Sequence, residues 1–195
     1  MTQVIRPAEK RDAYRIAEIL VFNYRLNFYP IFRDDAFYFD EMQVKSVAED
    51  YLTDGEALQN TYVYDDGAVK GMIQVSGDEI RKLFVEPVLQ GSGIGGAIYS
   101  AVIEMLAAQG YVNAIGIVAT PNHPSESLHE KCGFHLLFEM EKIAWKFGSW
   151  HNMAYYALRL NQPDGDPGRP IPFPELDRDY VLRVCERHTA AIKEA

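Results

Sequence analysis

Hydrophobic and polar positions alternate along much of this chain in the way that half-buried strands require. Residues 61–64 and 69–76 flank an Asp66-Gly67 pair, a combination typical of a tight hairpin turn. A further apolar run, 80–85, is followed by Pro87, which interrupts a strand. In all, the pattern predicts strands over residues 3–6, 61–64, 69–76, 80–85, 112–119, 136–146 and 153–160.

Stretches with helical spacing separate several of these strands. Between residues 12 and 23 the apolar positions Ile16, Ile19, Leu20 and Phe22 are close to helical spacing. Further helices are predicted over residues 40–52, 94–109 and 124–132. This order of elements predicts a mixed α/β domain with one strand–helix–strand crossover at its centre.

The character of the sequence changes after Leu160. Five of the ten prolines fall in this region, and from Glu175 a helix-like pattern places Leu182, Cys185 and Ile192 on one face. We therefore predict one domain over residues 1–161, followed by a proline-rich linker and a docked terminal helix over 162–195.

Composition narrows the class of protein. The 195 residues are 48% hydrophobic and carry a formal charge of −9, which argues against binding nucleic acid over a broad basic face. The two cysteines lie far apart, and no metal-ligand spacing is present. The N-terminal residues are too charged for a signal peptide, and no apolar run is long enough to span a membrane. The sequence thus predicts a cytoplasmic protein with neither membrane, nucleic-acid nor metal partners.

A glycine-rich segment between a strand and a helix is the main candidate for chemistry. Residues 90–96 read Gln-Gly-Ser-Gly-Ile-Gly-Gly, and such a turn lets successive N–H groups point into one concavity at a helix N-terminus, where a pyrophosphate binds well. A dinucleotide fingerprint also matches formally. It lies mid-chain, however, and no acidic ribose ligand stands about 20 residues further on.

Three blocks of sequence carry a resemblance to a known family. Gln90-x-x-Gly93-x-Gly95, with Val85 five residues earlier, resembles the coenzyme A loop of the GNAT acetyltransferases. The run from Asn122 through Leu128-His129-Glu130-Lys131 to Phe134 is similar to the asparagine loop and helix of that family. The Trp145-to-His151 block stands at the spacing seen in phosphinothricin and methionine sulfoximine acetyltransferases.

The resemblance implies a fold, a donor and a binding loop. The implied fold is an α/β GNAT acyltransferase fold with a mixed, mostly antiparallel sheet, flanking helices and splayed central strands. The implied reaction is direct transfer of an acetyl group from acetyl-CoA to an amine, with backbone N–H groups near Phe84 and Val85 holding the acetyl carbonyl. Donor binding is assigned to Phe84, Val85, Gln90, Gly91, Ser92, Gly93, Ile94, Gly95, Gly96, Asn122 and Ser125.

Two residues are candidates for proton transfer. Glu79 stands six positions before Val85, where some family members carry a general base, although the phosphinothricin group has its glutamate one place later, at the position of Ile80. Glu79 could equally be a solvated acid beside Asp78, and a water chain is an alternative base. His129 replaces a tyrosine that protonates the coenzyme A thiolate in many relatives, or else it is a packing residue.

The aromatic residues between 22 and 39 are expected to select the acceptor. They could roof a pocket that includes Phe28 and Tyr29, with Arg25 or Arg33 pairing a carboxylate of the substrate, although core packing explains most of these rings equally well. The expected acceptor is a small-molecule amine, such as an amino acid analogue related to phosphinothricin or methionine sulfoximine. Family likeness also implies a homodimer. The alternatives are a non-catalytic acyl-CoA sensor and a protein N-acetyltransferase.

Overall fold

The computed structural model describes residues 4–162, 164–166 and 168–192. Its strands are β1 (Val4–Pro7), β2 (Thr61–Asp65), β3 (Val69–Ser76), β4 (Glu79–Val85), β5 (Asn113–Thr120), β6 (His135–Lys146) and β7 (Ser149–Arg159). Its α-helices are α1 (Ala13–Asn23), α2 (Tyr29–Phe32), α3 (Val44–Thr53), α4 (Gly55–Gln59), α5 (Ile94–Ala108), α6 (His123–Lys131) and α7 (Arg178–Ala190). Within these residues no helix is long and apolar enough to cross a membrane.

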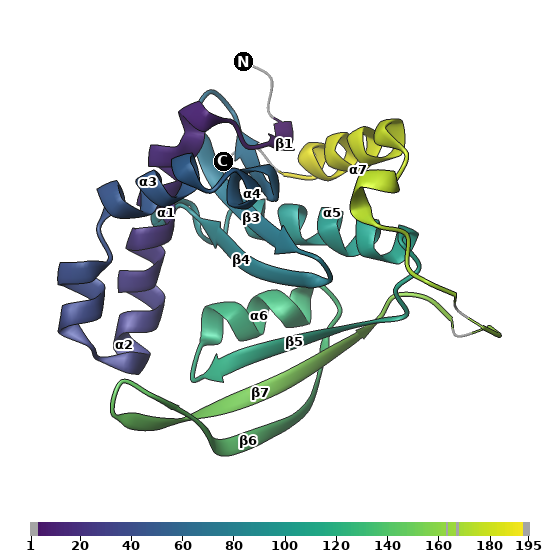
Figure 1. Ribbon diagram of the computed structural model, residues 1–195. Helices are drawn as coiled ribbons and strands as arrows, with labels where there is room; N and C mark the ends of the chain where they lie inside the picture. The colour runs from purple at the N-terminus through teal and green to yellow at the C-terminus, as the bar shows by residue number, and fades with distance from the viewer. Residues whose placement is uncertain (1–3, 163, 167, 193–195) are drawn as a thin grey trace.

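The strands form two antiparallel sheets, and β4 and β5 belong to different ones. The first sheet has the order β1-β2-β3-β4, and the second has the order β5-β7-β6. The edge of β4 is therefore not paired with β5, and the two sheets diverge in Figure 1. The expected α/β fold with splayed central strands is confirmed.

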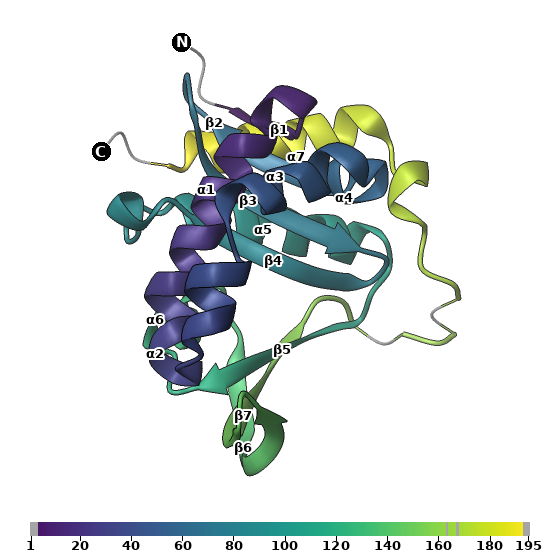
Figure 2. The ribbon, with the colours of Figure 1, turned by 60° about the vertical axis from the view of Figure 1, so that its left-hand side comes forward.

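Two apolar clusters hold the helices on opposite faces of the first sheet. One cluster joins α1 and α3 to β2 and β3 through residues such as Ile16 and Met72. The other joins α5 and α7 to β1 and β3 through residues such as Ile73, Ile98 and Val184. Figure 2 shows α1 and α3 in front of this sheet and α5 behind it. The apolar faces of α1 and α5 are thus buried against opposite faces of the first sheet.

The aromatic segment after α1 is helical, which its sequence pattern did not predict. Residues Tyr24–Phe28 and Ala36–Glu41 form π-helical turns on either side of α2. The wide turn after α1 is closed by a hydrogen bond from the Tyr29 N–H to the Tyr24 carbonyl. Isolated π-turns occur often at functional sites because they shift side chains relative to an α-helix.

The C-terminal segment docks on the domain, with a different face from the one expected. Helix α7 packs on α5 and β1, and the Ile5 N–H donates to the Thr189 hydroxyl at 3.1 Å. Cys185 and Ile192 are buried as predicted, but Leu182 is exposed and Val184 takes the buried position. The prediction for Leu182 was wrong because the buried stripe of α7 runs through Val181, Val184 and Cys185, and Leu182 lies beside that stripe.

Candidate functional site

The glycine segment forms a loop that turns the chain from β4 into α5. A 3-10 turn, Pro87–Leu89, follows β4, and Gly91 and Gly93 then adopt φ of +86° and +94°. Gly93 directly precedes the first residue of α5, so its conformation sets how the loop enters the helix. Positive φ is the region that glycine enters without strain. An added Cβ at Gly95 would stand 3.3 Å from the Val85 side chain, so the loop packs closely on the strand.

This loop borders a cleft of about 400 Å³ between α1, β4 and α6. The cleft falls in the size range of small-molecule and cofactor sites. Its lining residues are Asn23, Asn27, Phe28, Leu83, Phe84, Val85, Leu89, Gln90, Gly91, Gly93, Gly95, Gly96, Asn122, Pro124, Ser125, Ser127, Leu128 and Lys131. Nine of the eleven residues expected to bind acetyl-CoA therefore line one cleft, whereas Ser92 and Ile94 do not line it.

The start of α6 forms the opposite wall. The Asn122 side chain accepts a hydrogen bond from the Ser125 N–H at 3.4 Å, and the Glu126 carboxylate accepts one from the Asn122 N–H at 2.7 Å. This reciprocal capping fixes the first turn of α6. Asn122 and Ser125 thus line the cleft from a well-defined helix end.

The polar groups of the cleft suit an anion. Lys131 is the only charged side chain among the described lining residues. The Ser92 hydroxyl, in the same loop but not among the lining residues, is buried without a hydrogen-bond partner among the described residues. The N-terminus of α5 points its free N–H groups at the same loop. The residues present therefore fit the pyrophosphate of coenzyme A.

The register of β4 decides which of its backbone groups face the cleft. The Glu86 N–H donates to the Lys70 carbonyl, and Val85 lies opposite Gly71. Because hydrogen-bonded and non-hydrogen-bonded pairs alternate in an antiparallel ladder, Phe84 bonds to β3, whereas Leu83 and Val85 turn their N–H and C=O groups to the open edge. Of the two N–H groups expected to hold the acetyl carbonyl, only that of Val85 therefore faces the open edge of β4. Phe84 lines the cleft.

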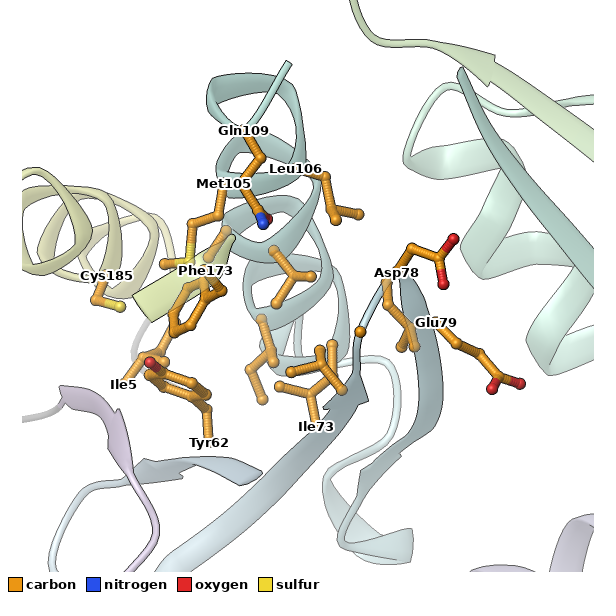
Figure 3. Close-up of a pocket in the computed structure, with 16 residues that line it drawn as sticks. Ile5, Tyr62, Ile73, Asp78, Glu79, Met105, Leu106, Gln109, Phe173 and Cys185 are labelled. Carbon is orange, nitrogen blue, oxygen red and sulfur yellow. The ribbon is translucent and has the colours of Figure 1, made fainter. Parts of the chain in front are cut away.

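Glu79 lies at the far end of β4. Six residues along a strand span roughly 20 Å, so its carboxylate is well separated from Val85. Glu79 is exposed, pairs with Arg81 at 3.3 Å and does not line the cleft. It borders a different cavity between β3, β4, α5 and the C-terminal segment, and in Figure 3 its carboxylate points away from the apolar interior. That cavity holds about 30 Å³, far less than the cleft and too little for a substrate.

His129 lies against the second sheet. Its Nδ1 donates to the Ser125 carbonyl at 2.8 Å, which leaves Nε2 to face Gly116, where an added Cβ would stand 2.6 Å from it. The rings of Tyr99, Phe134 and Tyr156 surround the imidazole at centroid distances of 5.2 to 5.5 Å. His129 does not line the cleft. The structure therefore does not bring the two predicted catalytic residues together, and both roles stay predictions.

Among the residues expected at the acceptor, only Phe28 lines the cleft. Arg25 donates to the carbonyls of Tyr38 and Met42, at 2.9 and 3.1 Å, so its guanidinium fastens the second π-turn. Arg33 donates to the Pro30 carbonyl and lies over the Tyr29 ring. These contacts occupy both arginines within their own segment.

Phe28 packs against Tyr24 and Phe84, with centroids 5.0 and 6.1 Å away. Burial raises the pKa of Tyr24, so its hydroxyl stays neutral and cannot accept a proton from the amine at ordinary pH. The acceptor end of the cleft is therefore aromatic and uncharged.

The sequence did not single out Asn23, Asn27 or Lys131 as site residues, although all three line the cleft. The sequence pattern did contain an indication that Asn23 makes internal hydrogen bonds. This residue continues the buried stripe of Ile16, Ile19 and Leu20 at the next helical position, and a polar residue on an apolar face requires an internal partner.

Comparison with known proteins agrees with this geometry. Residues 13–134 match the model of the acetyltransferase (GNAT) family. A phosphinothricin N-acetyltransferase from Streptomyces viridochromogenes is 25% identical over 136 residues, which are 63% of this chain and 73% of the relative. An L-methionine sulfoximine/L-methionine sulfone acetyltransferase from Pseudomonas aeruginosa is 30% identical over 92 residues, about half of each chain at 47% and 51%.

A solved structure of a relative has a similar fold. The phosphinothricin acetyltransferase of Sinorhizobium meliloti, solved in complex with acetyl-CoA, superimposes with a TM-score of 0.63 at 26% identity and covers 87% of this chain and 94% of its own. The chain belongs to the GNAT acetyltransferase family. It is an N-acetyltransferase, and acetyl-CoA is its acetyl donor.

Proposed function

We propose that this enzyme acetylates the amine of a small molecule by direct attack on acetyl-CoA, both substrates being held in the cleft between β4 and α6. The supporting observation is that the Val85 N–H, the glycine loop and Phe28 all border one cleft. The loop from Gln90 to Gly96 and Lys131 hold the diphosphate, and Asn122 and Ser125 contact the pantetheine arm. Bound acetyl-CoA supplies the activated carbonyl.

The Val85 N–H stabilises the negative charge that develops on the acetyl oxygen during attack. A preorganised backbone donor in a water-poor cleft acts as an oxyanion site. The attacking amine must be neutral, because a protonated amine has no lone pair. No carboxylate is among the described lining residues, so we assign proton removal to a water that contacts the Leu83 carbonyl on the open edge of β4.

The far end of the cleft is the proposed acceptor site. Phe28, Leu83 and Phe84 provide apolar surface, and Asn27 provides an uncharged hydrogen-bonding group. We propose an amino acid analogue as acceptor, in line with relatives named for phosphinothricin and for methionine sulfoximine or sulfone. We further propose that the enzyme acts in the cytoplasm, and the charge of −9 disfavours binding to nucleic acid or to anionic membranes.

A homodimer is the proposed assembly. Helix α6 covers one face of the second sheet, and the other face carries apolar side chains that are exposed, among them Ile115, Ile117, Phe138 and Met140. A contiguous apolar face of this kind marks an interaction surface in soluble proteins. A two-fold pairing of this face would bury it on both copies.

Thiol release from acetyl-CoA tests the function. The assay uses a panel of amines that includes phosphinothricin, methionine sulfoximine, methionine sulfone, free amino acids and a peptide with a free N-terminus. We expect turnover with one or more of the amino acid analogues and none with the peptide. Binding of acetyl-CoA without thiol release for any small amine would contradict the proposal.

A further inference from the structure

A buried amide at the end of α1 connects three parts of the cleft. Asn23 is 1% exposed, and a buried amide is costly unless its hydrogen bonds are made. Its Nδ2 donates to the Ile19 carbonyl at 2.7 Å and to the Val85 carbonyl at 2.8 Å. Its Oδ1 accepts from the Gln90 Nε2 at 2.8 Å and from the Asn27 Nδ2 at 3.0 Å. All four hydrogen-bonding positions of the side-chain amide are thus filled.

The bond to Val85 controls the open edge of β4. Val85 turns both its N–H and its C=O toward the cleft, because this residue is not bonded to β3. The Asn23 amide takes the carbonyl, as a neighbouring strand would. The backbone groups of this edge that stay available to a substrate are then the N–H of Val85 and the N–H and C=O of Leu83.

The bond to Gln90 fixes the glycine loop relative to the same strand. Gln90 opens the loop, and its side-chain amide donates to the Asn23 Oδ1 although the residue as a whole is exposed. One amide therefore sets the distance between the diphosphate loop and the backbone donor at Val85. The bond from Asn27, one turn further along the π-helical segment, extends this network to the acceptor end beside Phe28.

We propose that Asn23 is a positioning residue, which aligns the Val85 N–H with the diphosphate loop and links the donor site to the acceptor site. It does not touch the reacting atoms. This inference rests on the proposed location of acetyl-CoA in the cleft.

The first test compares Asn23→Asp with the wild type. The carboxylate is nearly isosteric, but it has no N–H to donate, and its oxygens would face two carbonyl oxygens. We expect the dissociation constant for acetyl-CoA, measured by calorimetry, to rise about tenfold or more, with a further loss in kcat. Gln109→Glu is the matched control, since Gln109 is also a buried amide that donates to a carbonyl, that of Ile171 at 2.8 Å, away from the cleft. The control should lose stability but retain wild-type affinity.

The second test uses a surface substitution that should not prevent the protein from folding. Gln90 is exposed, so Gln90→Ala should fold normally. In a double-mutant cycle, Gln90→Ala should weaken acetyl-CoA binding in the wild type but add little in the Asn23→Asp background, because it acts through Asn23. Wild-type affinity and kcat in folded Asn23→Asp, or fully additive effects in the cycle, would overturn the positioning role. Absence of acetyl-CoA binding by the wild type would instead overturn the assignment of the cleft itself.

Discussion

At the scale of single residues, Gly93 is a position where a side chain would disturb the donor site. Its φ of +94° lies in the region that disfavours side chains, yet no neighbouring atom lies within 4 Å of an added Cβ. A substitution would act on the backbone alone, at a cost of roughly 1–2 kcal/mol. The loop would relax to a different conformation, and its N–H groups would lose their common direction.

We expect Gly93→Val to abolish acetyl-CoA binding in calorimetry while the protein stays folded. Gly110, at the other end of α5, is a matched control, with a φ of +93° and open space around an added Cβ. Gly110→Val should lose similar stability and bind acetyl-CoA normally. Equal affinity in the two variants would remove the loop from the donor site.

His129 is a second residue at which structure and family likeness point to different roles. Likeness predicts that His129→Phe slows turnover more than it weakens donor binding. The geometry favours packing, since Nε2 faces a glycine and aromatic rings surround the imidazole. We therefore expect His129→Phe to retain most of kcat, measured by thiol release. A loss above about tenfold with unchanged donor affinity would restore the acid role.

At the scale of elements, regular periodicity could be predicted from the sequence, but long-range contacts could not. Alternation located the strands, and the Asp66-Gly67 pair located the first hairpin. The π-turns around α2 have no periodic pattern, so the aromatic segment gave no element boundaries. The loop was found because its chemistry is local. The partners of Asn23 at Val85 and Gln90 are 62 and 67 residues away, beyond any local pattern.

The orientation of α7 gives a prediction at this scale. Val184 is fully buried against the α5 side of the first sheet, whereas Leu182 is 47% exposed. Val184→Ala should lower the free energy of unfolding by about 2 kcal/mol, because it leaves a cavity. Leu182→Ala should change it by less than about 0.5 kcal/mol. Urea unfolding of the two variants measures the difference, and equal effects would mean that α7 docks through another face.

The attachment of β1 gives a pH-dependent prediction. Arg6 pairs with Asp12 at 2.7 Å and with Asp65 at 2.6 Å. The hydrogen bond from Arg6 lowers the pKa of Asp65. For Asp12, burial acts to raise the pKa, but the hydrogen bonds from Arg6 and the Glu9 N–H outweigh it, so its pKa is also lowered. Because both folded pKa values lie below the unfolded ones, this stabilisation is complete above about pH 4 and is lost as pH falls through the folded values.

Arg6→Met should therefore cost roughly 3 kcal/mol of unfolding free energy at pH 7, since it leaves two partly buried carboxylates unpaired. The difference from the wild type should be smaller at about pH 2 than at pH 7, because the two carboxyl groups take up protons as pH falls through their lowered folded pKa values. Urea unfolding at both pH values provides the measurement. A difference that stays constant with pH would mean that packing of the Arg6 stem, not its charge, holds β1 in place.

At the scale of the whole molecule, the two sheets differ in how they are covered. The first sheet has helices on both faces, while the second has α6 on one face and solvent on the other. Ile117 is 59% exposed at the middle of β5, opposite Tyr155 of β7. Phe138 stacks on that tyrosine from β6 at a centroid distance of 4.9 Å. Three adjacent strands thus present one continuous apolar surface.

Removing the apolar character of this surface should change the assembly without changing the donor site. We expect the wild type to sediment as a dimer and Ile117→Lys as a monomer, because two lysines would face an apolar partner surface at a two-fold interface. Ile171→Lys is the control, since Ile171 is 45% exposed in the C-terminal segment. It should leave the dimer intact. Because Ile117 does not line the cleft, the monomer should bind acetyl-CoA with wild-type affinity, so a dimeric Ile117→Lys would mean that the exposed face of this sheet is not the interface.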